Sequence, residues 1–261
     1  MRLVFVLVPL LACAAPQPLT FVQMCDPQFG FGGYDHDTNA FVVAVDQVNA
    51  RKPGLAVICG DFVDRFNTNS VSDFLRLRGR LTMPCLCTPG NHDVGNAPAP
   101  ATLRAYREAF GPDYFAYRTN GWTFLIVDTG LWMAHVADET ERQDAWLKTN
   151  LETAHAAHSP VIVIGHHPPF VEAPDEPNSY YNLPLARRRP IWDLFRTHGV
   201  VAYLGGHTHR TVDVTADGIR VLCGETTSRL FDGHPLGFRL WQVSATNLAV
   251  TAVPVDLPAE P

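Results

Sequence analysis

The sequence has few charged residues and lacks the repeats and low-complexity tracts that mark fibrous and disordered proteins. Asp, Glu, Lys and Arg make up 18% of its 261 residues and hydrophobic residues 46%, a balance typical of a globular chain with a substantial core. No Ser/Gly-rich or charge-block linker divides the chain, which favours one domain over two small ones. The net charge of −6 argues against nucleic acid as a partner, because a sequence-independent grip on phosphates needs an excess of basic residues.

Cysteine is also scarce and is not arranged as a structural framework. The six cysteines include no CxxC pair. Beyond Cys13 they are odd in number, so neither a disulfide framework nor a structural zinc site is indicated. These five are Cys25, Cys59, Cys85, Cys87 and Cys223. Each lies in or beside an apolar, strand-like run, and we expect buried free thiols.

The N-terminus has the pattern of a signal peptide. An apolar run over Leu3–Ala12 follows a basic start and ends in small residues. The run is too short to span a bilayer as a helix, and Pro9 inside it argues against the alternative of a buried first strand. We therefore predict a signal peptide over residues 1–15 and a single domain over residues 16–261.

The same segment allows a second interpretation. Leu10, Leu11, Ala12 and Cys13 resemble a lipobox, in which Cys13 would carry a lipid anchor, although Leu11 is imperfect for that pattern. Both interpretations predict an exported protein, periplasmic or extracellular, and the second predicts a lipoprotein tethered to a bacterial membrane. Free thiols fit an oxidising compartment less well than disulfides do.

Apolar runs alternate with helical patterns along the chain, which predicts an α/β fold. The strand-like runs are Leu19–Cys25, Leu55–Cys59, Cys85–Thr88, Thr123–Asp128, Val161–Gly165 and Val200–Leu204. The helical segments are Asn39–Ala50, Val71–Leu81, Ala101–Phe110, Glu139–Ala157 and Leu185–His198. A hairpin over Asp113–Val127 turns at Asn120 and Gly121, and antiparallel strands follow Thr211, so we expect mixed sheets.

Polar residues follow the ends of five predicted strands. Open α/β sheets place their sites at the carboxyl ends of strands, so we expect these side chains to share one rim. They are Asp26, Gly60–Asp61, Gly90–His92, Gly165–His167 and Gly206–His209. Carboxylates, one carboxamide and several imidazoles, without cysteine, suit divalent cations such as Mn, Fe or Zn.

The pattern predicts two metal ions rather than one. Asp61 can offer its two oxygens to two cations about 3.5–4 Å apart, an arrangement that clamps the attacking and leaving oxygens in phosphoester hydrolysis. Water between two cations loses its proton near neutral pH, so metal-bound hydroxide would be the nucleophile. No serine or cysteine nucleophile is then required.

Five motifs, in this order and spacing, resemble those of the calcineurin-like metallophosphoesterases. They are Asp26, Gly60-Asp61-Phe62-Val63-Asp64, Gly90-Asn91-His92-Asp93, Gly165-His166-His167 and Gly206-His207-Thr208-His209, within residues 20 to about 240. The resemblance implies a four-layer α/β/β/α sandwich with mixed sheets and a dinuclear site above them. It makes Asp26, Asp61 and His209 ligands of one metal, and Asp61, Asn91, His166 and His207 ligands of the other.

The resemblance also assigns catalytic roles around His92. This histidine would act as the general acid or as the donor to the scissile phosphate. Asp64 would hydrogen-bond His92 and hold it oriented and charged. Arg65 is placed to bind a phosphate oxygen of the substrate, and a solvated surface arginine is the alternative.

The chain departs from the common Asp-x-His pattern of this family at Gln28. A carboxamide is a poorer, neutral oxygen ligand than an imidazole, so Gln28 would bind the first metal weakly or only hydrogen-bond beside it. Further stretches are similar to the calcineurin-like phosphoesterase domain-containing proteins described as serine/threonine phosphatases, in which Gln is normal at this position. These stretches are Asp26–Gly30, Gly90–Gly95 and Tyr180–Leu183 followed by Arg187–Arg189.

A long loop over Phe170–Leu183 follows a predicted metal-binding strand end. Such loops shape substrate access, with a packing flap as the alternative. The candidates to line the substrate pocket are Tyr180, Tyr181 and Asn182. We expect His167 to face the substrate or support a ligand, with core packing as the alternative, and Arg187–Arg189 to form a solvated helix face.

Together these features predict a metal-dependent phosphoesterase that hydrolyses phosphate monoesters of small molecules or proteins. A phosphodiesterase acting on a cyclic nucleotide or a glycerophosphodiester is the alternative, since the same motifs serve both. A minor alternative is a non-catalytic binding module whose metal site has decayed through Gln28. The intact His92 and Asp61 argue against decay, and the acidic balance argues against a nuclease. The sequence does not indicate an oligomeric state.

Overall fold

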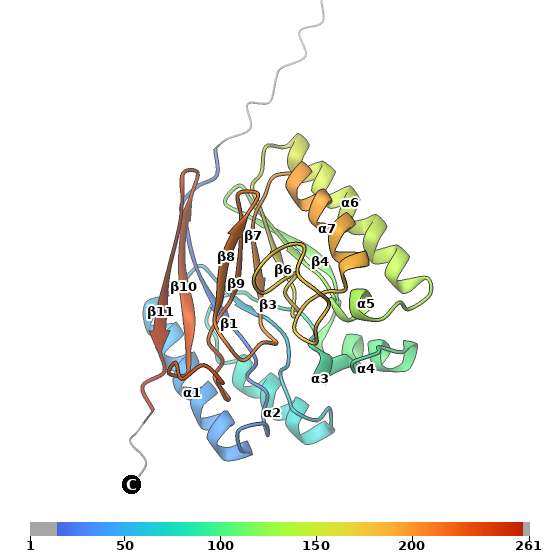
Figure 1. Ribbon diagram of the computed structural model, residues 1–261. Coiled ribbons are helices and arrows are strands. Elements are labelled where there is room, and N and C mark those ends of the chain that lie inside the picture. Colours follow the sequence, from blue (N-terminus) through green and yellow to red (C-terminus); the bar gives the residue numbers. More distant parts are fainter. Residues whose placement is uncertain (1–14, 258–261) are drawn as a thin grey trace, which may run out of the picture.

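Two β-sheets form the centre of the computed structural model, which describes residues 15–257 (Figure 1). The first sheet has the order β11-β10-β1-β2-β3 and the second the order β4-β5-β6-β7-β9-β8. The first comprises β1 (Leu19–Met24), β2 (Leu55–Ile58), β3 (Cys85–Cys87), β10 (Gly237–Ser244) and β11 (Asn247–Pro254). The second comprises β4 (Phe115–Thr119), β5 (Trp122–Ile126), β6 (Val161–Ile164), β7 (Val200–Gly205), β8 (Val212–Ala216) and β9 (Ile219–Cys223).

Both sheets are mixed, as the sequence predicts. β1 runs parallel to β2 and antiparallel to β10, and β7 runs parallel to β9, which pairs antiparallel with β8. The predicted hairpin is β4 and β5, which turn at Asn120 and Gly121. Both turn residues have positive φ, the conformation that Asn and Gly adopt most readily.

Seven helices connect the strands of the described part. They are α1 (Tyr34–Arg51), α2 (Thr68–Arg78), α3 (Asn91–Val94), α4 (Pro100–Phe110), α5 (Gly130–Met133), α6 (Glu139–Ala156) and α7 (Leu185–Thr197). The first begins five residues before its predicted start at Asn39. Asp35 and Asp37 in its first turn favour the helix dipole, although this polar stretch after two glycines resembles a loop in sequence.

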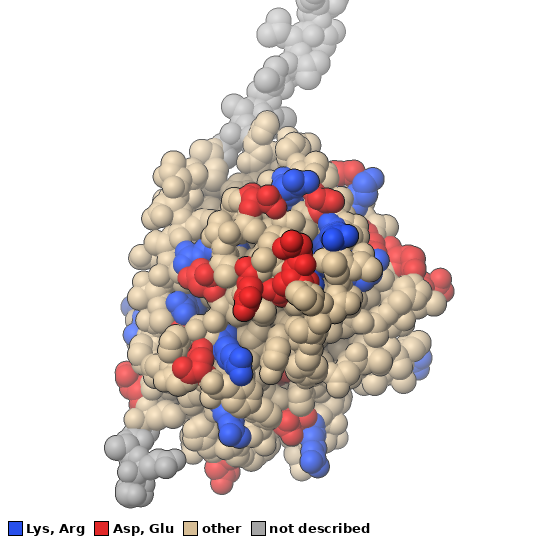
Figure 2. All heavy atoms as spheres, viewed as in Figure 1, with Lys and Arg blue, Asp and Glu red and all other residues tan. Residues whose placement is uncertain are grey.

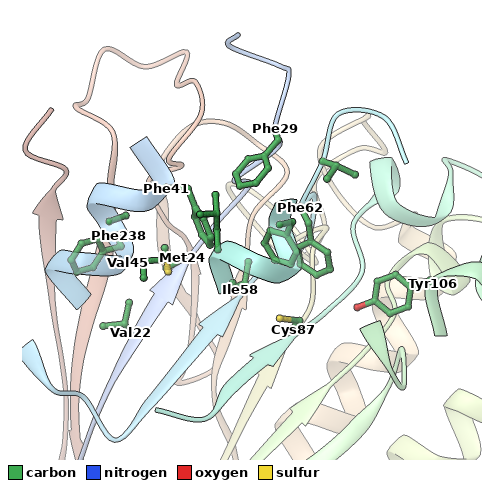
Figure 3. Close-up of a cluster of buried hydrophobic side chains, with 14 of the residues drawn as sticks. Val22, Met24, Phe29, Phe41, Val45, Ile58, Phe62, Cys87, Tyr106 and Phe238 are labelled. Carbon is green, nitrogen blue, oxygen red and sulfur yellow. The ribbon is translucent and has the colours of Figure 1, made fainter. Parts of the chain in front are cut away.

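The two sheets and the helices on their outer faces form four layers, and a hydrophobic cluster lies between each pair of neighbouring layers. The middle cluster joins the inner faces of the two sheets, where the rings of Phe21 and Trp241 stack with centroids 5.6 Å apart. A second cluster packs the first sheet against α1, α2 and α4, and it includes the stacked rings of Phe62 and Phe74 (Figure 3). The third packs the second sheet against α6 and α7. The predicted α/β/β/α sandwich is confirmed.

The strands divide their side chains between these clusters. Phe21 of β1 faces the middle cluster whereas Val22 faces the helices, and Ile162 and Val163 of β6 separate in the same way. Successive side chains of a strand point to opposite faces, so strands buried on both sides appear in sequence as continuous apolar runs.

Four of the five described thiols are buried and Cys85 is half-buried, and all five are free, as the sequence predicts. No helix within residues 15–257 combines the length and apolar character needed to cross a membrane. The predicted signal peptide and Cys13 lie outside the described residues.

Candidate metal centre

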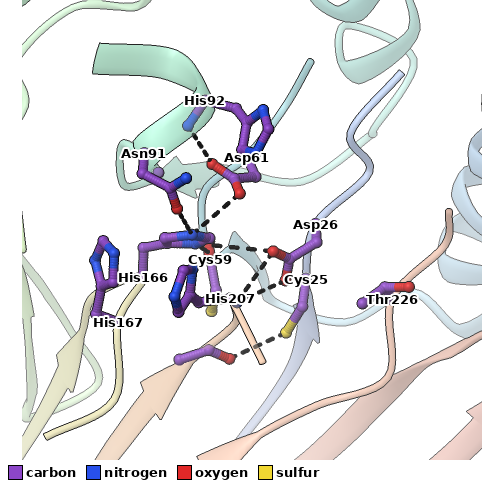
Figure 4. A network of polar contacts seen from close by, with 12 residues as sticks. Cys25, Asp26, Cys59, Asp61, Asn91, His92, His166, His167, His207 and Thr226 are labelled. Atoms are coloured by element: carbon purple, nitrogen blue, oxygen red, sulfur yellow. Dashed lines mark hydrogen bonds and ion pairs between the residues drawn. The ribbon is translucent and has the colours of Figure 1, made fainter. Parts of the chain in front are cut away.

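The polar strand ends meet at one rim, where residues far apart in sequence come into contact (Figure 4). His166 Nε2 lies 3.2 Å from Asp61 Oδ2 and 3.0 Å from Asn91 Oδ1. Asp26 Oδ1 lies 3.6 Å from His209 Nε2 and accepts a hydrogen bond from the backbone N–H of His207. The structure therefore brings six of the seven predicted ligands together around two carboxylates.

The backbone at this rim is strained, and the strain falls mainly on the residues predicted to bind metal. Five predicted ligands are non-glycine residues with a positive φ, between 37° and 67°. These are Asp26, Gln28, Asp61, His207 and His209. Such conformations cost about 1–3 kcal/mol each and cluster where function requires a fixed side-chain direction.

Two glycines of the motifs are required by close approach rather than by turn geometry. A Cβ at Gly90 would clash with the Asp61 carboxylate, and a Cβ at Gly206 would clash with that of Asp26. Neighbouring strand ends can therefore approach closely enough to share ligands only when these positions have no side chain.

Backbone carbonyls fix the orientation of the three clustered imidazoles. His166 Nδ1 lies 2.8 Å from Cys59 O, and His209 Nδ1 lies 2.6 Å from Arg229 O. His207 uses its other nitrogen, Nε2, which lies 2.9 Å from Tyr180 O. Each ring thus uses one nitrogen for a carbonyl. The second nitrogen of His166 faces Asp61 and Asn91 and that of His209 faces Asp26, so a metal ion could be bound between these groups.

The buried charges at the rim perturb one another. Burial raises the pKa of Asp26, whereas His166 overcomes the effect of burial at Asp61 and lowers the pKa of that carboxyl. Burial opposes charge on His166, but Asp61 and Asp26 raise its pKa to about 10. Two carboxylates in this buried position favour a positive charge between them, which divalent cations would supply.

Gln28 lies in the same loop as Asp26, with 1% of its surface exposed. Its backbone N–H donates to Asp61 O at 2.8 Å. Its side-chain Oε1 is buried and has no hydrogen-bond partner. An unpaired buried amide oxygen is costly in a folded protein, and a metal ion is one partner that would satisfy it. The donor set thus fits divalent cations.

His167 is brought closer to the centre than the sequence indicates. Its ring centroid lies 4.2 Å from that of His207, and ring nitrogens of both fall with one of His166 into a group compact enough to hold an ion. Thr129 Oγ1 contacts His167 Nδ1 at 2.9 Å. Burial lowers the pKa of His167, and burial lowers that of His207 to about 3, which favours the neutral ring, the form that binds metals.

His92 lies at the open edge of the cluster, with 31% of its side chain exposed. Its backbone N–H donates to Asp61 Oδ1 at 2.8 Å. Its ring Nδ1 contacts the backbone carbonyl of Asp64 at 2.8 Å, whereas the Asp64 carboxylate is farther, at 3.5 Å. The contact that orients His92 is therefore the backbone carbonyl of residue 64, whereas the predicted contact was with its carboxylate.

Arg65 is exposed to solvent, whereas the Asn182 amide is used within its own loop. The Arg65 side chain is 90% exposed, and its only described ion-pair partner is Asp64 at 3.9 Å, which matches the alternative of a solvated arginine. Asn182 is buried, and both ends of its amide are used within its own loop. Its Oδ1 accepts from Ser179 N–H and its Nδ2 donates to Pro177 O.

Tyr180 and Tyr181 flank His207 at the rim. The Tyr180 ring is 58% exposed and its centroid lies 4.7 Å from that of His207, while Tyr181 lies at 6.1 Å. The loop therefore supplies two aromatic rings and one carbonyl to the centre. This placement is consistent with both the predicted pocket lining and the role of the loop as a support for His207.

The prediction that Arg187–Arg189 form a solvated face is wrong for Arg188, which is fully buried. Its guanidinium donates to the carbonyls of Leu183, Pro174 and Glu176, each at 3.1 Å. The loop before α7 folds back over the first turn of the helix. Arg188 holds it there through hydrogen bonds to three backbone carbonyls. The helical periodicity of the sequence does not predict that Arg188 is buried in this contact.

Replacing Arg188 with Met should loosen this loop and, through Tyr180 O, the orientation of His207. We expect the free energy of unfolding to fall by about 2–4 kcal/mol, because three buried carbonyls lose their donor. Limited proteolysis should cleave within residues 171–183, and metal affinity should fall about tenfold. Arg189→Met, on the exposed neighbour, is the matched control, and equal behaviour of the two variants would contradict this role.

Two aromatic residues beside His209 are not predicted by the sequence. The Phe31 ring lies 4.8 Å from the His209 ring, and the Phe231 ring lies 5.4 Å from it with 45% of its surface exposed. Both lie in irregular loops, where no hydrophobic periodicity distinguishes them. An exposed phenylalanine beside a motif histidine is visible only in three dimensions.

Asp128, at the end of β5, is a buried carboxyl outside the cluster. Its Oδ1 accepts from Gly130 N–H at 2.8 Å, Oδ2 has no partner, and burial raises its pKa to about 8. A raised carboxyl pKa stabilises the fold at low pH, and that contribution is lost as pH rises from about 4 to about 8.

Asp128→Asn should therefore stabilise the protein increasingly as pH rises. The amide keeps the acceptor for Gly130 but cannot ionise, so we expect a gain of about 1–3 kcal/mol at pH 8 and little at pH 5. Thermal unfolding at the two pH values measures this, with exposed Asp193→Asn as control. A gain that is the same at both pH values would show that ionisation of Asp128 is not the cause.

Comparison with known proteins gives concordant results. Residues 19–211 match the family described as Calcineurin-like phosphoesterase. A Danio rerio protein named Serine/threonine-protein phosphatase CPPED1 is 29% identical over 256 residues, 88% of this chain and 83% of that protein. The Escherichia coli K12 protein named 3',5'-cyclic adenosine monophosphate phosphodiesterase CpdA is 25% identical over 189 residues, 71% of this chain and 65% of that protein.

Solved structures of other proteins share this fold. The structure of a dimetal phosphatase from Danio rerio superposes with a TM-score of 0.67 at 16% sequence identity, over 91% of this chain and 99% of that one. At this identity the likeness concerns the fold. The matched segment 19–211 includes every predicted metal ligand.

Proposed function

Because the chain belongs to the calcineurin-like phosphoesterase family, we propose that it is a phosphatase that hydrolyses phosphate monoesters at a dinuclear metal centre. The observation that carries this proposal is the convergence of Asp26, Asp61, Asn91 and the three imidazoles at one rim. Each imidazole is held by a backbone carbonyl at one ring nitrogen, and the second ring nitrogens of His166 and His209 face Asp61 and Asp26. A structural cluster of histidines would not need that common arrangement.

We assign the ligands as follows. Asp26, Gln28 and His209 would hold one cation, Asn91, His166 and His207 the other, and Asp61 both. Two divalent cations, when bound, would stabilise charge that develops on the phosphoryl oxygens and lower the pKa of water. The identity of the metals is proposed only as Mn, Fe or Zn, which this mixture of oxygen and nitrogen donors suits.

The chain's own residues would supply orientation and proton transfer. His92 is held through Nδ1 by Asp64 O, and we propose that its Nε2 protonates the leaving oxygen. Asp61 binds the backbone N–H of His92 and so links the position of the acid to that of the ligands. Because the donor is the backbone N–H, this link is kept when the His92 side chain is replaced and lost when Asp61 is.

A monoester is the substrate class that the rim favours. Two exposed guanidinium groups lie over aromatic rings next to the ligand histidines, Arg210 over Tyr181 at 5.9 Å and Arg229 over Phe231 at 5.5 Å. Positive charge at the rim suits the dianion of a monoester more than the monoanion of a diester. The name of the zebrafish relative supports a phosphoprotein substrate, and that of the bacterial relative supports the alternative of a cyclic nucleotide diester.

A polymeric phosphodiester substrate is less well supported. The face shown in Figure 2 intersperses basic and acidic side chains rather than presenting a continuous basic surface. The net charge of −6 agrees with this pattern. Nucleases that track a backbone use aligned basic and aromatic side chains.

The test is the rate of p-nitrophenol release from p-nitrophenyl phosphate and from its bis-diester. Metal-stripped protein is refilled in turn with Mn, Fe and Zn. We expect metal-dependent activity that is faster on the monoester. Faster cleavage of the diester would favour the cyclic nucleotide alternative, and no metal-dependent activity on either substrate would favour a narrow substrate or a non-catalytic binding module.

We also propose that the protein is exported, on the signal-like pattern of residues 1–15 alone. The mass of the chain recovered from its native host distinguishes the two versions of this proposal. Cleavage before residue 15 or 16 without added mass would indicate a secreted protein, and a lipid on Cys13 an anchored one. An intact N-terminus in a cytosolic fraction would contradict both.

A further inference from the structure

β3 carries a pair of thiols that the phosphoester centre does not use. Cys85 and Cys87 are the two ends of this strand, with one residue between them, so their side chains leave the same face. Their Sγ atoms are 3.9 Å apart. Cys87 faces the cluster between the first sheet and its helices (Figure 3), while Cys85 is half-buried at the edge of the sheet.

The separation of the two sulfurs fits a shared ion. Two metal–sulfur bonds of about 2.3 Å that meet at a trigonal angle place the sulfurs about 4.0 Å apart. A disulfide instead requires about 2.05 Å, and alternate residues of a strand have Cα atoms about 6.6 Å apart, near the upper limit for such a bond. The strand therefore holds the pair at a chelating distance.

A cation beside Cys87 favours the thiolate form of this residue, whereas the hydrogen bond with Cys87 and burial raise the pKa of Cys85, whose proton a bound metal ion would displace. Arg78 Nη1 lies 3.6 Å from Cys87 Sγ. The hydrogen bond from Cys85, followed by the charge of Arg78, lowers the pKa of Cys87 against the effect of burial. Elsewhere in the described part, burial raises the pKa of the Cys59 and Cys223 thiols. Cys87 is thus distinguished from the thiols that are merely buried.

The surroundings select the kind of ion. Within residues 15–257, no third His, Cys, Asp or Glu completes a compact group with Cys85 and Cys87, so a four-ligand zinc site is not formed. Met83, two residues before Cys85, packs against the same cluster and offers a thioether. Two thiolates, the Arg78 guanidinium and one monovalent cation sum to zero charge.

We propose that Cys85 and Cys87 chelate a soft monovalent cation of the Cu(I) type, at a site separate from the phosphoester centre. Soft thiolate and thioether ligands select Cu(I), whereas the imidazole and carboxylate donors at the rim suit harder ions. The proposal does not depend on the proposed hydrolytic activity. It predicts that copper and phosphatase metals occupy different parts of the same chain.

The experiment is a Cu(I) titration of metal-stripped, reduced protein under anaerobic conditions, with bicinchoninate as the competing chromophoric chelator. A Cys13→Ser background removes the thiol outside the described residues. We expect one Cu(I) per chain, with affinity about 100-fold lower in Cys85→Ser and in Cys87→Ser. Asp61→Asn and Cys223→Ala, which alter the rim and another buried thiol, should each keep the site.

A second measurement requires no variant. Cu(I) should protect Cys85 and Cys87 from alkylation in the folded protein, and X-ray absorption should show sulfur neighbours at about 2.3 Å. Copper bound by nitrogen and oxygen, or no protection of these thiols, would overturn the proposal. In the titration, unchanged Cu(I) affinity in the folded Cys85→Ser/Cys87→Ser double variant would also overturn it.

Discussion

Asp61→Asn should lower turnover of a phosphate monoester by about 10³-fold or more and should release bound metal. Asp61 forms a compact group with Asp26 and His166, with its Oδ2 3.2 Å from His166 Nε2, and its Oδ1 accepts a hydrogen bond from the backbone N–H of His92. An amide removes the negative charge that two cations would share. Loss of several kcal/mol of charge stabilisation corresponds to a fall of this size.

The measurement pairs turnover with metal content per chain after dialysis. Asp73→Asn is the matched control, because it makes the same change to an exposed carboxylate on α2 that pairs with Arg76. The control should keep both activity and metal. An Asp61→Asn protein that retains its metal content would place the shared ligand elsewhere.

His92→Ala should lower turnover by about 10²-fold or more while the bound metal stays unchanged. His92 lies at the edge of the cluster, with its Nδ1 held by Asp64 O, and its ring is not among the contacts between the predicted ligands. Loss of a positioned proton donor costs about 10²–10⁴-fold. The decrease should appear in kcat more than in KM.

Two further variants distinguish the role of His92. Asp64→Asn should cost about tenfold or less, because the backbone carbonyl that orients His92 at 2.8 Å is retained and the carboxylate lies at 3.5 Å. His135→Ala, in an exposed histidine paired with Glu141, should leave turnover unchanged. Loss of metal in His92→Ala would instead make His92 a ligand.

The fold and the main ligands are predictable because both follow from local patterns. Strands such as Val161–Ile164 are buried on both faces and so appear as uninterrupted apolar runs. Ligands such as Asp26 and His207 follow strand ends within short motifs. The parallel order of the strands then brings their carboxyl ends to a common rim.

The parts that the sequence did not predict depend on long-range contacts of single residues. Arg188 has the sequence context of an exposed helical arginine, yet the loop before α7 buries it against three carbonyls. Asn182 likewise turns inward to hold that loop. Phe31 and Phe231 meet His209 from two loops separated by about 200 residues of sequence. Neither hydrophobic periodicity nor motif spacing predicts such contacts.

The most direct test of the dinuclear account is the number of Mn(II) ions that the metal-stripped chain binds at equilibrium. Mn(II) suits the oxygen and imidazole donors of the rim and disfavours thiolates, so the pair on β3 would not contribute. We predict two ions per chain, with turnover that follows occupancy of the second. A single ion per chain at saturation, with full turnover, would contradict the account.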